Sequence, residues 1–91
     1  MAERCVQVRV TGRVQGVWFR GWTQAQAERL GLDGWVQNAE DGSVEAVLAG
    51  PEAAVDAMLA ALRRGPELAR VDAVEVAASG EAVPQGFVIA R

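Results

Sequence analysis

The sequence predicts an α+β fold in which two helices cover one face of an antiparallel sheet. Polar and apolar residues alternate near the N-terminus, as in a half-buried strand. Two segments rich in helix-forming residues separate further strand-like segments. The order of segments is strand, helix, strand, strand, helix, strand, with a short extra strand at the end. Because a chain of 91 residues that is 51% hydrophobic can bury one modest core, we predict a single domain over residues 1–91.

The first half of the chain contains a strand, a loop and a helix. Val6, Val8 and Val10 alternate with polar residues, which predicts a strand over residues 5–13 with the valines facing the core. Glycines then interrupt the alternation and indicate a loop. Helix-forming residues dominate residues 19–30 and predict the first helix.

A hairpin and a second helix follow. Residues 34–37 and 43–49 read as strands, and residues 38–42, which end in an Asp-Gly pair, read as the turn between them. Gly50, Pro51 and Glu52 mark the start of the second helix. Its apolar residues recur with the spacing of one helical face. They are Val55, Met58, Leu59 and Leu62.

The last segments complete the sheet. Residues 70–77 predict a fourth strand with Val74 and Val76 facing inward, and residues 87–89 predict a short final strand. The β-α-β-β-α-β order is that of a ferredoxin-like open sandwich, here with one extra C-terminal strand.

The composition excludes several kinds of chemistry. The chain has no His, no Tyr and a single Cys, so His-based triads and zinc sites built on His and Cys are not expected. We therefore expect neither a metal nor a cofactor. The single Cys cannot form an internal disulfide, and no secretory signal or membrane-spanning run of about 20 apolar residues is present. These features favour a cytoplasmic location and no membrane partner.

The charge is unevenly distributed. The net charge is −3, yet residues 1–20 contain four Arg and one Glu and are therefore basic. An acidic protein is a poor general binder of nucleic acid, which needs broad neutralisation of phosphates. A basic N-terminal segment on an acidic body suits a small anionic ligand better.

The loop between the first strand and the first helix is the candidate anion site. Backbone N–H groups at a helix start can converge on an anion, and Gly16 allows the backbone to approach it closely. Arg20 lies in the first helical turn, where a cation opposes the helix dipole unless an anion lies between them. The alternative is a surface arginine that pairs with Glu40 or Asp41.

The remaining candidates are less specific by themselves. Asn38 is of a type common in turns, so a structural role is at least as good an interpretation as a functional one. Arg13 reads as a solvated strand-end residue. Whether Trp18 borders the ligand or packs inward is left open.

Two segments resemble the signatures of the acylphosphatase family. Residues 10–20 read VTGRVQGVWFR and are similar to the first signature. Residues 34–38 read GWVQN and, with Gly42, Val44 and Gly50 at the matching intervals, are similar to the second. Chain length and the order of elements agree, so the resemblance covers nearly the whole chain.

The resemblance implies metal-independent hydrolysis of acyl phosphates to a carboxylate and inorganic phosphate. It implies that Arg20 binds the phosphate and that Asn38 holds the attacking water. It also implies that five backbone N–H groups cradle the phosphoryl oxygens. They belong to Gln15, Gly16, Val17, Trp18 and Phe19. This chain has Ala39 directly after Asn38, whereas some members of the family carry a hydroxyl residue at that position.

Two other functions share this fold class. The chain could be a non-catalytic ligand-sensing module, or a regulatory domain descended from acylphosphatases as occurs within larger maturation proteins. The presence of both Arg20 and Asn38 favours the enzyme over the sensor. The expected partners are a small acyl phosphate and the phosphate product, and nothing in the sequence demands more than a monomer.

Overall fold

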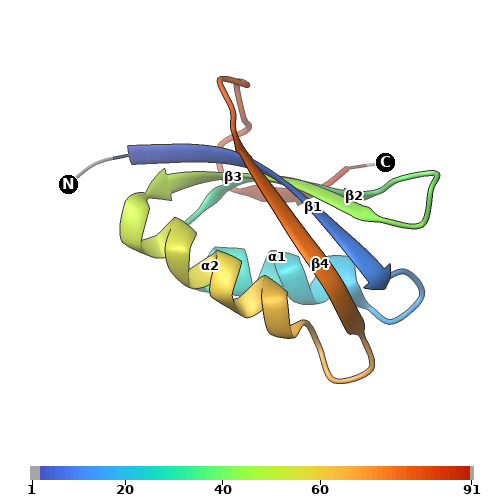
Figure 1. Ribbon diagram of the computed structural model, residues 1–91. Coiled ribbons are helices and arrows are strands. Elements are labelled where there is room, and N and C mark those ends of the chain that lie inside the picture. Colours follow the sequence, from blue (N-terminus) through green and yellow to red (C-terminus); the bar gives the residue numbers. More distant parts are fainter. Residues whose placement is uncertain (1–2, 91) are drawn as a thin grey trace.

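The computed structural model describes residues 3–90 and contains five strands and two helices. Their order agrees with the order predicted from the sequence. In chain order the elements are β1 (Glu3–Arg13), α1 (Phe19–Arg29), β2 (Asp33–Asn38), β3 (Val44–Pro51), α2 (Glu52–Arg64), β4 (Arg70–Ala78) and β5 (Phe87–Ile89). Figure 1 shows both helices on the same face of the sheet.

The sheet is mixed, with the strand order β4-β1-β3-β2-β5. The four longer strands pair antiparallel, as predicted. The short strand β5 instead pairs parallel with β2, so the antiparallel description fits only β1 to β4. This pairing brings the end of the described chain beside β2. The backbone N–H of Ala90 extends the contact by donating to the carbonyl oxygen of Val36, 2.8 Å away.

The core lies between the sheet and the two helices. The side chains of Val6, Val8 and Val10 on β1 are at most 2% exposed, which confirms the predicted inward face of that strand. The four apolar residues of the predicted α2 stripe are also buried. Burial of this face stabilises the fold by removing apolar surface from water.

One residue predicted to face inward is more exposed than expected. Val74 packs against the core, but Val76 is 37% exposed. Strand β4 lies at the edge of the sheet, so no further strand covers its outer side. The period-2 pattern gave the correct side of the strand and could not show that the strand is an edge.

Helix α1 ends where the sequence predicts. Gly31 has a φ of 71°, and the N–H of Leu32 donates to the carbonyl oxygen of Ala27 at 2.9 Å. A left-handed glycine followed by this bond is a common way to satisfy the last carbonyl groups of a helix. The chain thereby turns directly into β2, which leads to Asn38.

Candidate active site

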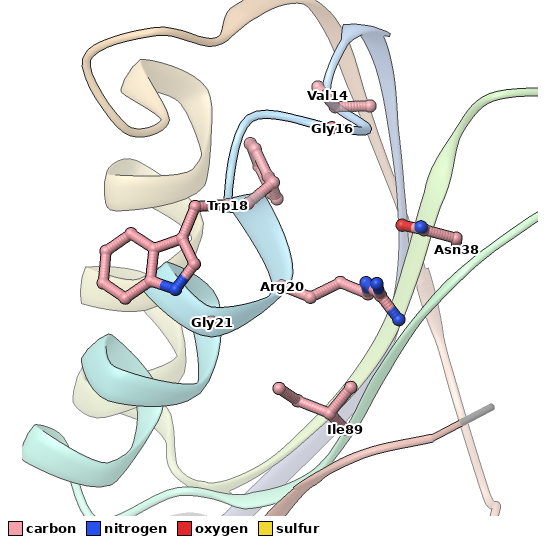
Figure 2. Close-up of a pocket in the computed structure, with 8 residues that line it drawn as sticks. Val14, Gly16, Trp18, Arg20, Gly21, Asn38 and Ile89 are labelled. Carbon is pink, nitrogen blue, oxygen red and sulfur yellow. The ribbon is translucent and has the colours of Figure 1, made fainter.

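A pocket of about 540 Å³ opens between the loop after β1, the start of α1 and the end of β2. Figure 2 shows this pocket, with Arg20 extending from α1 toward Asn38 on β2. Its lining residues come from four parts of the chain. They are Val14, Gly16, Trp18, Phe19, Arg20, Gly21, Asn38 and Ile89.

Arg20 is the second residue of α1, at the end of the helix where the dipole is positive. The first turn of α1 contains no acidic residue. Within residues 3–90, Arg20 forms no ion pair and donates no hydrogen bond. The alternative of a pair with Asp41 does not occur, because that carboxylate pairs with Arg9. The guanidinium is therefore available to an anion in the pocket.

Asn38 is the last residue of β2, and its partner on β3 is Val44. The sequence had assigned Asn38 to the turn. The strand extends one residue further because the ladder between β2 and β3 continues to this pair. In Figure 2 the side-chain amide of Asn38 faces the pocket near the guanidinium of Arg20. The position at the end of a paired strand fixes its backbone more firmly than a turn would.

The loop from β1 to α1 contains two residues in a left-handed conformation. Gly16 has a φ of 74°, which glycine adopts without cost. Trp18 has a φ of 65° and lies at the N-cap of α1. For a bulky residue this conformation costs about 1–2 kcal/mol. The loop thus contains local strain beside the pocket, as binding loops often do.

The N-terminus of α1 is open toward the pocket. No side chain caps it, so the first N–H groups of the helix are not bonded to a capping oxygen. Of the five residues predicted to offer backbone N–H groups, Gly16, Trp18 and Phe19 line the pocket. Gln15 and Val17 are not among the lining residues, and the side chain of Val17 packs against the core.

Trp18 borders the pocket and does not pack inward. Its side chain is 69% exposed. Figure 2 shows its indole beside Gly21 and directed away from Arg20. Of the two alternatives that the sequence left open, the structure excludes inward packing.

The side chain of Gln15 has a contact that the sequence did not predict. Its Nε2 donates to the carbonyl oxygens of Ala39 and Ser43, both at 2.8 Å. The family resemblance implies only a backbone role for Gln15. A glutamine in a loop gives no sign of its partner, because the partner lies on a different element.

Within residues 3–90, no three His, Cys, Asp or Glu side chains lie together as metal ligands would. Neither helix of this part of the chain is long and apolar enough to cross a membrane.

Comparison with known proteins identifies one family. The acylphosphatase family matches residues 6–89. An acylphosphatase of Rhizorhabdus wittichii is 56% identical over 81 residues, which cover 89% of this chain and 82% of the relative. One of Rhizobium meliloti is 55% identical over 90 residues, which cover 98% and 95%.

A solved structure agrees with the sequence matches. The structure of an acylphosphatase from Coxiella burnetii superposes with a TM-score of 0.92 at 35% identity, over 97% of this chain and 93% of that one. The match therefore extends from sequence to the arrangement of all the elements around the pocket. The chain belongs to the acylphosphatase family.

Proposed function

We propose that this protein hydrolyses the carboxyl-phosphate bond of acyl phosphates, with Arg20 and the loop amides holding the phosphate and Asn38 positioning the attacking water. The observation that carries this assignment is the convergence of Arg20 from α1 and Asn38 from β2 on one pocket beside the loop. Family membership supports the reaction, and the geometry supports the roles of the residues.

The electrostatics favour a phosphate between Arg20 and the start of α1. Helix N–H groups and a guanidinium both donate hydrogen bonds, and both carry positive charge toward the same point. A guanidinium can form two parallel bonds to a phosphate, which fixes its orientation as well as its position. Since Arg20 has no acidic partner within residues 3–90, no ion pair must break before the substrate binds.

The reaction needs no general acid. Water attacks phosphorus, the bond between phosphorus and the carboxyl oxygen breaks, and that oxygen leaves with the electron pair as a carboxylate. The conjugate acid of this leaving group has a pKa of about 4, so it departs without a proton. The proton of the attacking water is released to solvent. A leaving alkoxide of a phosphate monoester would lack this advantage.

The attacking water needs orientation more than deprotonation. Phosphoryl transfer passes through a loose transition state, in which bond formation to water is little advanced. The amide of Asn38 can donate to and accept from water, though it cannot act as a base. Arg20 and the loop N–H groups would stabilise charge on the equatorial oxygens, as preorganised donors do in other enzymes.

The pocket leaves space for the acyl part of the substrate. Its volume of about 540 Å³ is in the range of small-molecule sites. Ile89 on β5 is 39% exposed and contributes an apolar side chain to the wall. Figure 2 shows that side chain on the far side of Arg20 from Gly16. We infer that small apolar acyl groups fit this wall.

Hydrolysis of benzoyl phosphate, measured with and without EDTA, tests the proposal. We expect turnover that chelation does not reduce. Folded protein that binds phosphate but does not turn over would instead be a ligand-binding module. Loss of turnover on chelation would contradict the metal-independent mechanism.

We also propose that the protein is a monomer and that it acts in the cytoplasm. The net charge of −3 favours a dispersed protein, and a single Cys suits a reducing compartment. Light scattering across a range of concentrations tests the first point, and a constant mass of one chain is expected. Fractionation of source cells tests the second.

A further inference from the structure

The side-chain amide of Gln15 connects the loop after β1 to the hairpin that carries Asn38. Its Nε2 lies 2.8 Å from the carbonyl oxygen of Ala39 and 2.8 Å from that of Ser43. One amide nitrogen has two hydrogens, so both are used in this contact. The contact is partly buried, which protects it from competing water.

The two acceptors lie next to Asn38 in the structure. Ala39 follows Asn38 in the chain, and Ser43 precedes Val44, the strand partner of Asn38. Gln15 therefore binds the two ends of the turn, next to Asn38 on one side and next to its strand partner Val44 on the other.

The turn is closed by its own hydrogen bonds. The N–H of Ala39 donates to the carbonyl oxygen of Ser43 at 2.9 Å, and that of Gly42 donates to the carbonyl oxygen of Ala39 at 3.2 Å. The carboxylate of Asp41 accepts from the N–H of Ser43 at 2.9 Å. The hairpin should thus survive loss of the Gln15 contact, which adds only the connection to the loop.

Within residues 3–90, Gln15 provides the hydrogen bonds between the loop and the turn, while the ion pair of Arg9 with Asp41 joins the turn to β1. No other hydrogen bond in that range joins loop residues 14–18 to turn residues 39–43. Gly16, next to Gln15, and Asn38, next to Ala39, both line the pocket. The Gln15 amide therefore connects the neighbour of one lining residue to the neighbour of another, without itself lining the pocket.

We propose that Gln15 is a positioning residue, which sets the place of the Asn38 amide relative to the phosphate loop. This inference rests on the proposed function. It assigns Gln15 an action through Asn38 and no contact of its side chain with the substrate. Small displacements of a positioning group have large effects on rate, so loss of the contact should lower kcat by about 10–100-fold.

Gln15→Met tests the inference, because methionine is similar in length and donates no hydrogen bond. We expect kcat for benzoyl phosphate to fall while the inhibition constant of inorganic phosphate is unchanged. Gln15→Glu should be at least as impaired, since a carboxylate would face two carbonyl oxygens. Gln24→Met is the matched control, because Gln24 makes the same type of bond, to the carbonyl oxygen of Phe87 at 3.0 Å. It should keep the native kcat.

A double variant separates positioning from general structural damage. If Gln15 acts through Asn38, Gln15→Met should cause no further loss in an Asn38→Ala background. If the kcat of the double variant falls by the product of the two single-variant reductions, the inference is wrong. It is also wrong if Gln15→Met has native kcat, or if its phosphate affinity falls as much as its kcat.

A spectroscopic measurement keeps the test independent of turnover. Asn38 is the only Asn in the chain, so ¹⁵N labelling of asparagine side chains gives one pair of amide signals. The chemical shifts of this pair should change in Gln15→Met and remain unchanged in Gln24→Met. An unshifted pair in Gln15→Met overturns the positioning role. If native protein fails to hydrolyse benzoyl phosphate while the pair shifts as expected, the proposed function fails and the connection to Asn38 stands.

Discussion

The indole of Trp18 occupies the space that a side chain at residue 21 would fill. A Cβ added to Gly21 would lie 2.2 Å from Nε1 of Trp18. Trp18 is the N-cap of α1, and Gly21 lies in the first turn of the same helix. The absence of a side chain at Gly21 therefore lets the exposed indole lie against the helix beside the pocket.

This contact predicts that the effects of two substitutions on stability depend on each other. Alanine is favoured over glycine in helices by about 1 kcal/mol. In a Trp18→Ala background, Gly21→Ala should therefore stabilise the protein by about 0.5–1 kcal/mol. In the native background the gain should be smaller, because the indole must move. Urea unfolding of the four proteins of this cycle measures the difference, and equal gains in both backgrounds would contradict the contact.

Replacement of Arg20 should remove substrate binding and turnover together. Loss of a preorganised donor to a transition-state oxygen lowers rates by about 100–1000-fold, and Arg20→Ala also removes the main positive charge of the pocket. We expect kcat/KM for benzoyl phosphate to fall at least this far, with weaker inhibition by inorganic phosphate. Arg20→Lys should recover part of the affinity, because it keeps the charge without the paired donors.

Arg13→Ala is the control for the arginine variants. Arg13 is exposed at the end of β1 and does not line the pocket. Its removal takes away the same charge at the other end of the loop. Native kinetics in Arg13→Ala would show that the effect depends on position, whereas an equal loss in both variants would make general electrostatic attraction the better explanation.

Asn38→Ala should lower kcat while leaving the binding of phosphate intact. The phosphate would still contact Arg20 and the loop, so inhibition by inorganic phosphate should persist. The water would lose its orienting amide, and kcat should fall by about 100-fold. Gln37→Ala is the matched control, because Gln37 carries the same amide on the adjacent residue and bonds to Glu45 outside the pocket, at 3.1 Å. Full activity of Asn38→Ala would refute the water-positioning role.

The sequence predicted the helices and strands well, but it predicted only part of how they pack and pair with one another. Periodicity reports which side of a strand or helix is apolar, and this was sufficient for β1 and α2. It does not report neighbours, so neither the parallel pairing of β5 nor the exposure of Val76 on an edge strand could be predicted. These properties depend on the strand order of the finished sheet.

The same limit applies to the site. The position of Arg20 at a helix start indicated an anion, because a cation there is unfavourable alone. Asn38 lies on a different element, and only the family resemblance connected the two residues. The contact of Gln15 and the left-handed backbone of Trp18 depend on loop geometry that no periodic pattern encodes.

Gly34 should tolerate no side chain. It has a φ of 140°, and an added Cβ would lie 1.9 Å from the carbonyl oxygen of Val47 on the paired strand β3. Backbone strain and the clash should together destabilise Gly34→Ala by about 3 kcal/mol or more. Gly80→Ala is the control, because an added Cβ meets no atom within 4 Å. It should change the free energy of unfolding by no more than about 1 kcal/mol. Equal stability of the two variants would contradict the described packing of β2 on β3.

The helix stripe predicted from the sequence can be tested with two leucines. Leu62 on α2 is 1% exposed, whereas Leu68 in the following loop is 75% exposed. Leu62→Ala leaves a cavity between α2 and the sheet and should lower the free energy of unfolding by about 2–5 kcal/mol. Leu68→Ala removes the same atoms from water-exposed surface and should change it by no more than about 0.5 kcal/mol. Urea unfolding measures both, and similar losses would mean that α2 does not pack on the sheet through this face. Because Leu62 does not line the pocket, the residual folded fraction of Leu62→Ala should keep its affinity for inorganic phosphate.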